Sequence, residues 1–153
     1  MSDTANRTLS INRTFDAPLQ LVWDAWTKDK HIAQWWGPKG MKTKVIEHDF
    51  RVGGKWHYVM AMPDGNEFIT EGIYSKIDEL KEIFTSADFK PMTEGVDMQT
   101  LFQADGSKTN FTLNVIHSTE EYCKQQEEMG FFQGWGSVMN EFDSFLQKQK
   151  SAS

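Results

Sequence analysis

Glu71 is the side chain with the most evident chemical potential, because it lies among apolar residues in a segment that alternates like a β-strand. A carboxylate that faces the interior of a sheet is costly unless it is paired or hydrogen-bonded. Such a group could orient a hydroxyl or cation of a ligand, or act as a general base if burial raises its pKa. The simpler alternatives are a structural pair with Tyr58 or Arg13, or a position in water at the open end of a cavity. Glu47 and Asp49 allow the same interpretations, with exposure at the rim preferred.

The other groups that could do chemistry lack the partners that they would need. His48 and His57 can come opposite each other in a hairpin, but no third ligand is evident, so we expect no metal and no cofactor. His31 and His117 have no serine or cysteine nucleophile in a recognisable motif. The single cysteine, Cys123, has glutamates nearby in the sequence, which raise the pKa of a thiol and keep it unreactive. We therefore assign no catalytic residue, and the question of enzymatic activity stays open.

Composition excludes several classes of function. The chain has 153 residues and a net charge of −6, so it has no basic field that would attract nucleic acid. No apolar run is long enough to span a membrane, and the N-terminus lacks the apolar core of a secretory signal, so we expect a cytoplasmic protein. Aromatic residues make up 13% of the chain, with six Trp and eleven Phe. This exceeds what a minimal core requires, so bulky side chains are expected to line an interior site.

The first elements that would position these residues are a strand and two short helices. Residues 8–15 alternate and predict a strand with Arg13 on its otherwise apolar face. Residues 18–26 begin with proline and continue at helical spacing, which predicts a short helix. A second short helix carries Trp35-Trp36 and is expected to end at Gly37-Pro38. One of these adjacent tryptophans is expected to pack inward and the other to close a cavity mouth, unless both simply cover the core.

From residue 41 onward, short strands alternate with turn signals, and two of these turns predict a register. A two-residue turn at Asp64-Gly65 pairs Tyr58 with Glu71, Met60 with Ile69, and Trp56 with Ile73. A similar turn at Asp105-Gly106 pairs Thr100 with Phe111 and Met98 with Leu113. We expect all ten side chains to share the concave face of one sheet.

Two further features of this meander are predicted. In the strand that begins at residue 41, Glu47 and Asp49 are expected to face the cavity or its rim. The lysines and His48 of that strand, together with His57, are expected to face solvent, since lysine is rarely buried. Residues 88–94 contain Pro91 and are expected to form an irregular lip.

The last long apolar stripe, residues 130–146, has the spacing of an amphipathic helix. A capping-box pattern at Ser118-Thr119-Glu120-Glu121 opens a helix before it, and Gly130 is expected to bend or restart the chain there. Such an apolar helix must lie on a sheet. Trp135 and Met139 are the positions where it would meet a ligand, whereas its later apolar residues close the core.

Taken together, the elements predict an α+β protein with the helix-grip fold. We expect a curved antiparallel sheet of about six to seven strands wrapped around a long C-terminal helix, with two short helices after strand one. A single domain over residues 1–153 is expected, with an ordered core from about 8 to 147.

Four stretches of sequence also carry a resemblance to a known family. They are FDAPLQLVWDAWTKDKHIAQWWGPKG, HDFRVGGKWHYVM, PDGNEF and MGFFQGWGSVMNEFDSFL. These resemble the signatures of the activators of heat-shock-protein-90 ATPase and their homologues, in the START-like, birch-pollen-allergen-like superfamily (SRPBCC), from about Phe15 to Leu146. The resemblance implies a helix-grip domain with an internal cavity that binds lipids, polyketides or other apolar molecules, sometimes with catalysis. Co-chaperone members carry an additional N-terminal domain, whereas only a short polar segment precedes residue 8 here.

Three hypotheses follow. The first is a non-enzymatic domain that binds a largely apolar small molecule, without a nucleic-acid or membrane partner. The second is a module that binds a chaperone partner through its surface, and the third is an enzyme that uses Glu71 for acid-base chemistry. The residues expected to contact a ligand are Trp56, Tyr58, Met60, Ile69, Glu71, Ile73, Met98, Thr100, Phe111, Leu113, Trp135 and Met139. The simpler alternative is that the same residues form a dry core.

Overall fold

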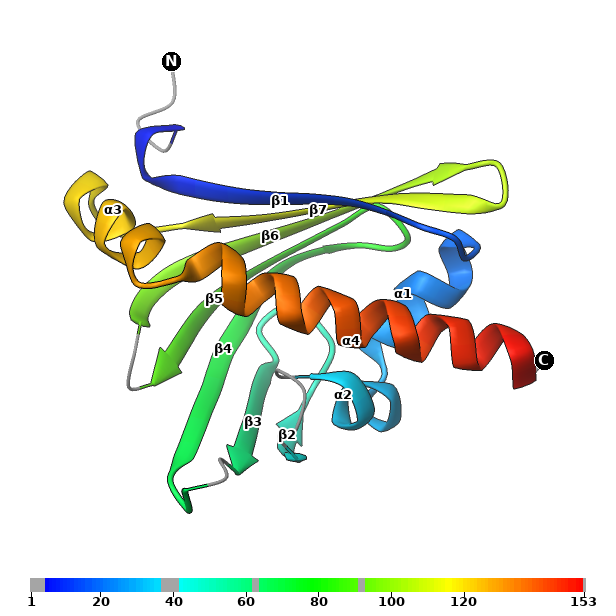
Figure 1. Ribbon diagram of the computed structural model, residues 1–153, viewed down its shortest axis with the longest axis horizontal. Coiled ribbons are helices and arrows are strands. Elements are labelled where there is room, and N and C mark those ends of the chain that lie inside the picture. Colours follow the sequence, from blue (N-terminus) through cyan, green and yellow to red (C-terminus); the bar gives the residue numbers. More distant parts are fainter. Residues whose placement is uncertain (1–4, 37–41, 62–63, 91–92, 153) are drawn as a thin grey trace.

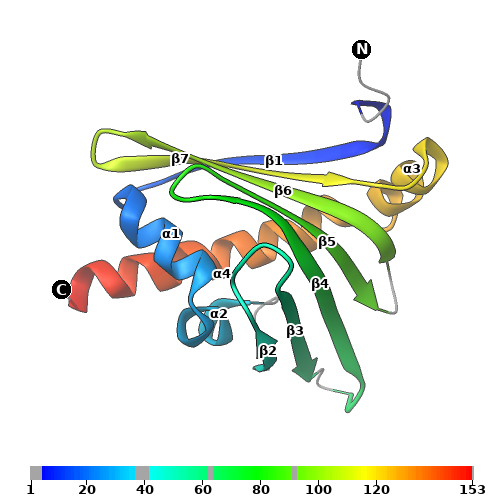
Figure 2. The same cartoon turned by 180° about the vertical axis from the view of Figure 1, so that it is seen from behind.

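A curved antiparallel sheet packed against a long C-terminal helix is the main feature of the computed structural model, which describes residues 5–36, 42–61, 64–90 and 93–152. Figure 1 shows helix α4 (Phe131–Ala152) crossing the concave side of the sheet. Helices α1 (Leu19–Thr27) and α2 (Asp29–Trp35) lie beside the C-terminal half of α4, as both views show (Figures 1 and 2). No helix among the described residues combines the length and apolarity needed to cross a bilayer.

The sheet has seven strands in the order β1-β7-β6-β5-β4-β3-β2. Their bounds are β1 Thr8–Phe15, β2 Lys42–His48, β3 Lys55–Ala61, β4 Glu67–Asp78, β5 Glu82–Lys90, β6 Thr93–Asp105 and β7 Lys108–Ile116. Strands β2 to β7 form a meander in which each pairs with the next, and β1 joins at the far edge by pairing with β7. The predicted helix-grip fold, with two short helices after the first strand, is confirmed.

The helices begin and end for local reasons that the sequence shows. Pro18 directly precedes α1, and α3 (Glu120–Glu128) is capped by the Thr119 hydroxyl, which accepts a hydrogen bond from the Tyr122 amide at 3.0 Å. Gly130, with a φ of 105°, separates α3 from α4, so the predicted restart of the helix is confirmed. The apolar stripe of α4 faces the sheet and buries Met139 and Phe142 completely.

The predicted irregular lip at residues 88–94 is wrong for the residues that the structure describes. Strand β5 continues through Lys90, and β6 begins at Thr93. The reason is that buried side chains keep alternating along β5, at Thr85, Ala87 and Phe89, so strand periodicity continues past residue 87. Pro91 and the helix stop expected at Gly37-Pro38 lie outside the described residues.

The register of β3 on β4 differs from the expected one by a single residue. Tyr58 pairs with Thr70, Met60 with Phe68 and Trp56 with Gly72, and residues 62–66 connect Ala61 to its partner Glu67. The connection is therefore longer than the expected two-residue turn. Because neighbouring side chains point to opposite faces, this slip places Ile69, Glu71 and Ile73 on the convex face instead of the concave face. Ile73 accordingly has 46% of its surface exposed.

The pairing of β6 with β7 also differs, but without a change of face. Asp105 pairs with Lys108, so Thr100 lies opposite Leu113 and Met98 opposite Val115. The predicted partners are therefore wrong by two residues. A shift by two preserves the face on which each side chain lies, and Phe111 and the other side chains predicted to be concave are buried.

A β-bulge in β2 changes the orientation of its last residues. Val45 pairs with Tyr58, but the register shifts before Glu47, which pairs with His57, and His48 then pairs with Trp56. The bulge turns His48 to the concave side, whereas it was expected to face solvent, and exposed Glu47 lies beside His57 on the convex side and not at the cavity or its rim. Asp49 does not reach the cavity either, because it follows the strand and forms an ion pair with Arg51 at 2.8 Å.

Gly72 occupies the most crowded point of the sheet. A Cβ atom built there would lie 1.9 Å from the backbone oxygen of Ser86 and 2.8 Å from Nε1 of Trp56. Backbone would have to move to admit a side chain. Gly134 in α4 is the opposite case, since an added Cβ there meets no atom within 4 Å.

We predict that Gly72→Ala lowers the free energy of unfolding by about 2 kcal/mol or more, because overpacking forces backbone shifts. Gly134→Ala is the matched control, and it should raise the same quantity by roughly 0.5–1 kcal/mol by removing a flexible residue from a helix. Urea unfolding followed by circular dichroism measures both values. Equal stability of the two variants would contradict the close packing of Gly72 against Ser86 and Trp56.

Candidate functional site

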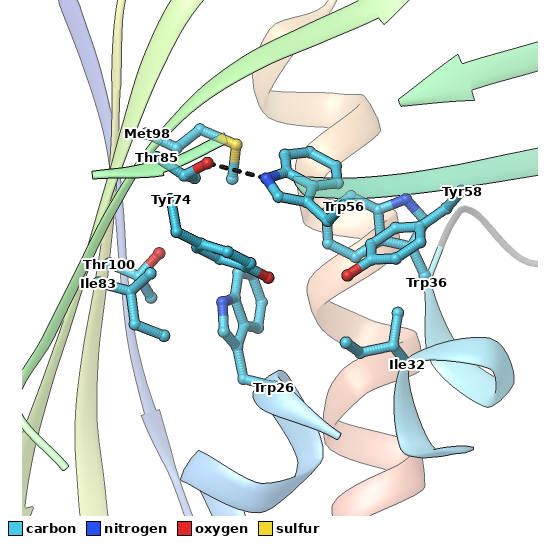
Figure 3. A pocket seen from close by; sticks show the side chains of 10 residues that line it. All are labelled: Trp26, Ile32, Trp36, Trp56, Tyr58, Tyr74, Ile83, Thr85, Met98 and Thr100. Atoms are coloured by element: carbon cyan, nitrogen blue, oxygen red, sulfur yellow. Dashed lines mark hydrogen bonds between the residues drawn. The ribbon is translucent and has the colours of Figure 1, made fainter. Parts of the chain in front are cut away.

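A small internal cavity lies between the concave face of the sheet and helices α1 and α2 (Figure 3). Its volume is ≈ 30 Å³, which is room for roughly one or two water molecules. The wall combines aromatic and aliphatic side chains with hydroxyl groups. It consists of Trp26, Ile32, Trp36, Trp56, Tyr58, Tyr74, Ile83, Thr85, Met98 and Thr100.

Simple periodicity brings these residues together. On β3, β5 and β6 the wall residues are two apart, as in the pair Trp56 and Tyr58, so each pair projects from the same face. The helices contribute from the other side, with Trp26 near the end of α1 and Ile32 and Trp36 from α2 and its end. The cavity is therefore lined by four strands and two helices.

Apart from Trp135, the predicted ligand-contacting residues fall into three groups. Trp56, Tyr58, Met98 and Thr100 line the cavity. Met60, Phe111, Leu113 and Met139 are buried in the core without being part of that wall. Ile69, Glu71 and Ile73 lie on the other face of the sheet, because of the one-residue slip between β3 and β4.

Trp135 is half-buried and lies behind the cavity wall. Its indole ring meets Phe89 at 5.7 Å and Trp36 at 6.1 Å, in both cases edge to face. Trp36 therefore stands between Trp135 and the cavity.

Sequence reasoning missed six residues of the wall. Tyr74 was missed because of the slip between β3 and β4, although the same alternation that buries Thr70 predicts its orientation once the register is known. The others are Trp26, Ile32, Trp36, Ile83 and Thr85. One of the two adjacent tryptophans was expected to close the cavity, and Trp36 is the one that lies in its wall. Trp35 instead stacks on Trp26, with the centroids of these two rings 5.0 Å apart.

A chain of hydrogen bonds forms the polar corner of the site. His48 Nε2 lies 2.5 Å from the backbone oxygen of Thr27, at the end of α1, and Nδ1 lies 2.7 Å from the hydroxyl oxygen of Tyr58. A carbonyl oxygen can only accept, so Nε2 carries the hydrogen atom, and Nδ1 of the neutral ring accepts from Tyr58. Tyr74 presents a second hydroxyl group to this corner. Figure 3 shows the two hydroxyls pointing toward each other.

Burial keeps the hydroxyl groups of Tyr58 and Tyr74 protonated. The pKa of Tyr58 is raised far above its ordinary value, first by burial and then by the neighbouring Tyr74. Burial likewise raises the pKa of Tyr74, although the neighbouring Tyr58 opposes the shift. Neither tyrosine is therefore available as a phenolate base near neutral pH.

A second pair of polar groups in the wall is fully used within the protein. The indole Nε1 of Trp56 donates to the Thr85 hydroxyl at 2.8 Å, and this hydroxyl lies 2.9 Å from the backbone oxygen of Ile73, to which it donates. These bonds fix the indole plane of Trp56 across β3, β4 and β5.

Acid-base chemistry by Glu71 has no place in this cavity. On the convex face, its carboxylate lies 3.9 Å from Nε2 of His57. None of the described residues that line the cavity is a carboxylate. No group of three His, Cys, Asp or Glu side chains suited to a metal ion occurs in the part of the chain that the structure describes. Elsewhere, burial and the nearby Glu127 raise the pKa of the Cys123 thiol.

A curved sheet that wraps around a C-terminal helix and encloses a cavity places the protein in the helix-grip class of the START-like superfamily. The family described as activator of Hsp90 ATPase homolog 1-like protein matches residues 16–147. Because this match covers most of the sequence, the chain belongs to that family.

Solved structures agree with this assignment. The crystal structure of a protein from Nitrosomonas europaea has 27% sequence identity and a TM-score of 0.82, with 96% of this chain and 98% of that chain covered. A protein from Mycobacterium smegmatis has 24% identity and a TM-score of 0.84, with 97% and 96% covered. An AHSA1-like protein from Aeromonas hydrophila has 20% identity and a TM-score of 0.76, with 94% of each chain covered. Among curated proteins, none matches the sequence.

We predict that Tyr58→Phe lowers the free energy of unfolding by about 1–3 kcal/mol, because it leaves the buried Nδ1 of His48 without its partner. Glu71→Gln serves as the control, and it should change the same quantity by less than about 0.5 kcal/mol, because the side chain is half-exposed on the convex face. Urea unfolding measures both. A larger loss for Glu71→Gln than for Tyr58→Phe would contradict the observed register of β3 on β4.

Proposed function

We propose that the protein is a binding domain that holds a largely apolar small molecule in the cavity between the sheet and helices α1 and α2. The observation that carries this proposal is the composition of the wall, in which aromatic and aliphatic side chains surround one polar corner of tyrosine hydroxyls. Ligand sites in proteins are typically apolar concavities with a few placed polar groups. The helix-grip fold supports the proposal, since it positions these residues around an interior space.

The size of the cavity sets a condition on the ligand. A volume of ≈ 30 Å³ admits water, so a larger ligand must displace part of the wall. Trp36 is the side chain best placed to move. It follows the last residue of α2 with extended backbone angles, φ −65° and ψ 124°, so its ring can turn without unwinding the helix.

The contacts of Trp36 support this role. Its ring meets Trp56 at 6.0 Å and Tyr58 at 5.3 Å, which are both wall residues, and only 8% of its surface is exposed. If the indole ring of Trp36 moved away, the space that it now fills would become part of the cavity. In this proposal the structure represents the closed state, and the ligand stabilises an open one.

We predict that Trp36→Ala creates a space that binds indole. The variant should be less stable than the wild type by about 3–5 kcal/mol, because a large buried side chain is lost. Indole should then raise its melting temperature and bind measurably in calorimetry, as apolar ligands do in engineered apolar cavities.

The control is Ile73→Ala, a residue that the expected register would have placed in the cavity but that lies on the convex face. It should show no binding of indole beyond that of the wild type. Apolar compounds of increasing size are tested on the wild-type chain by thermal shift and by quenching of tryptophan fluorescence. The proposal loses its basis if no compound shifts either the wild type or Trp36→Ala.

A second candidate function is suggested by the description of the family as homologues of an Hsp90 ATPase activator. Two apolar side chains are exposed where α3 meets α4, Met129 by 56% and Phe132 by 41%. Neighbouring exposed apolar side chains are typical of interaction surfaces. If this candidate is right, the protein stimulates the ATPase of a cognate 90-kDa chaperone, and Phe132→Ser reduces the stimulation severalfold whereas Tyr74→Phe does not. A chaperone ATPase rate that is unchanged at high molar excess of the protein would remove this candidate.

A further inference from the structure

We propose that the hydroxyl group of Thr70 anchors the polar group of the ligand, and that the ligand is an apolar molecule that carries one hydroxyl or carbonyl group. The inference rests on the proposed function, because it adds a residue to the same binding site and specifies the chemical class of the ligand. The observation that carries it is a buried hydroxyl group. Thr70 is completely buried, and its Oγ1 atom has no hydrogen-bond partner among the described residues.

Other buried threonines in the described part of the chain use their hydroxyl groups within the protein. Thr27, Thr85 and Thr109 each donate to a backbone oxygen, at 2.7, 2.9 and 2.8 Å. A buried hydroxyl group without a partner costs stability. Valine has the same shape, avoids this cost and is favoured in strands. Packing alone therefore gives no reason for a hydroxyl group at position 70.

Thr70 adjoins the wall of the cavity. It lies on β4 with Tyr58 opposite on β3 and Phe89 opposite on β5, and all three side chains are buried. Side chains directly opposite each other in antiparallel strands have Cβ atoms about 4.5–5.5 Å apart. Two residues further along β4, Gly72 leaves room for the indole of Trp56. Tyr58 and Trp56 both line the cavity, so Thr70 has a wall residue on two sides.

Trp36 covers this part of the wall. Its ring contacts Tyr58 and Trp56, which are the two wall residues that adjoin Thr70. If the ring of Trp36 moves aside, as the proposed function requires, the space that it leaves lies beside these two residues. A ligand that enters this space therefore comes close to Thr70.

Aromatic rings close the other side of the same space. The ring of Phe89, the other neighbour of Thr70, meets Trp135 at 5.7 Å, and Trp135 meets Trp36 at 6.1 Å. The body of a ligand between these rings is in an apolar environment, which favours an apolar ligand. The hydroxyl group of Thr70 can both donate and accept, so it can pair with a hydroxyl or a carbonyl group of the ligand.

The stability of two valine variants tests whether the hydroxyl group of Thr70 is used within the protein. Thr70→Val should melt at the wild-type temperature or above it, because it removes a buried polar group that has no partner. Thr85→Val is the matched control. It should melt about 2 °C lower or more, since it leaves Nε1 of Trp56 and the backbone oxygen of Ile73 without this partner. A loss in Thr70→Val as large as that in Thr85→Val would overturn the inference.

Phenol and toluene test the anchor itself, because they have nearly the same shape and only phenol carries a hydroxyl group. Calorimetry on Trp36→Ala gives the ratio of the affinity for phenol to the affinity for toluene. When Thr70→Val is added to this variant, the ratio should fall about fivefold or more, because one hydrogen bond is lost. When Thr70→Ser is added instead, the ratio should be retained, because serine keeps the hydroxyl group.

The possible results separate this inference from the proposed function. An unchanged ratio after Thr70→Val would overturn the inference and leave the proposed function standing. Failure of every apolar compound, phenol and toluene included, to bind either the wild type or Trp36→Ala would overturn both together. If the double variants do not fold, thermal shifts by the two probes on Thr70→Val and on the wild-type chain give the same comparison.

Discussion

The packing of Phe142 against four aromatic rings is the interaction on which the rest of the structure depends. Phe142 projects from α4 and is completely buried. Its ring lies 4.5 Å from Trp35, 5.1 Å from Phe15, 5.5 Å from Trp26 and 6.0 Å from Phe111. These rings come from α2, β1, α1 and β7, so one side chain joins the long helix to both short helices and to both strands at one end of the sheet. The contacts with Trp35, Phe15 and Trp26 are edge to face, and such contacts add to the free energy gained from apolar burial.

This packing also explains the location of the cavity. Trp26 and Trp35 both contact Phe142 of α4. Trp26 and Trp36 line the cavity together with residues of the middle strands of the sheet. These strands curve away from the helices as the sheet bends around α4, as Figure 1 shows. The space left between them is the cavity. The cavity is thus a consequence of sheet curvature at the place where the short helices α1 and α2 cover the sheet.

Two local irregularities give the cavity its polar corner. The bulge between Val45 and Glu47 turns His48 toward the C-terminal end of α1, where it meets the Thr27 carbonyl group. Because a helix leaves its last carbonyl groups without partners in the helix, this bond satisfies an acceptor that would otherwise need water. Gly72 leaves room for the indole of Trp56. A regular strand in either place would present different side chains to the interior.

These irregularities also mark the limit of what the sequence could predict. The order of elements, the stripe of α4 and the concave faces of β6 and β7 follow from periodicity, since an error of two residues in a turn leaves each face unchanged. The turn between β3 and β4 carries an Asp-Gly signal, but the connection spans residues 62–66, and this odd shift moved Glu71 out of the predicted site and Tyr74 into it. The bulge in β2 has no signature in the alternation of that strand, so the inward turn of His48 could not be predicted.

The polar groups of the corner are more than a closely packed apolar core requires. An apolar interior gains little stability from two tyrosines and a histidine, because a hydrogen bond formed on folding replaces one made with water. Phenylalanine at both tyrosine positions, with an apolar residue in place of His48, would fill the same space. Such side chains would form no hydrogen bonds and would need no particular donor or acceptor beside them. In the observed arrangement the Thr27 carbonyl group accepts from His48, and His48 accepts from the Tyr58 hydroxyl. The consequence of this chain of hydrogen bonds is therefore orientation more than stability, since it directs the hydroxyl hydrogen of Tyr58 at Nδ1 of His48.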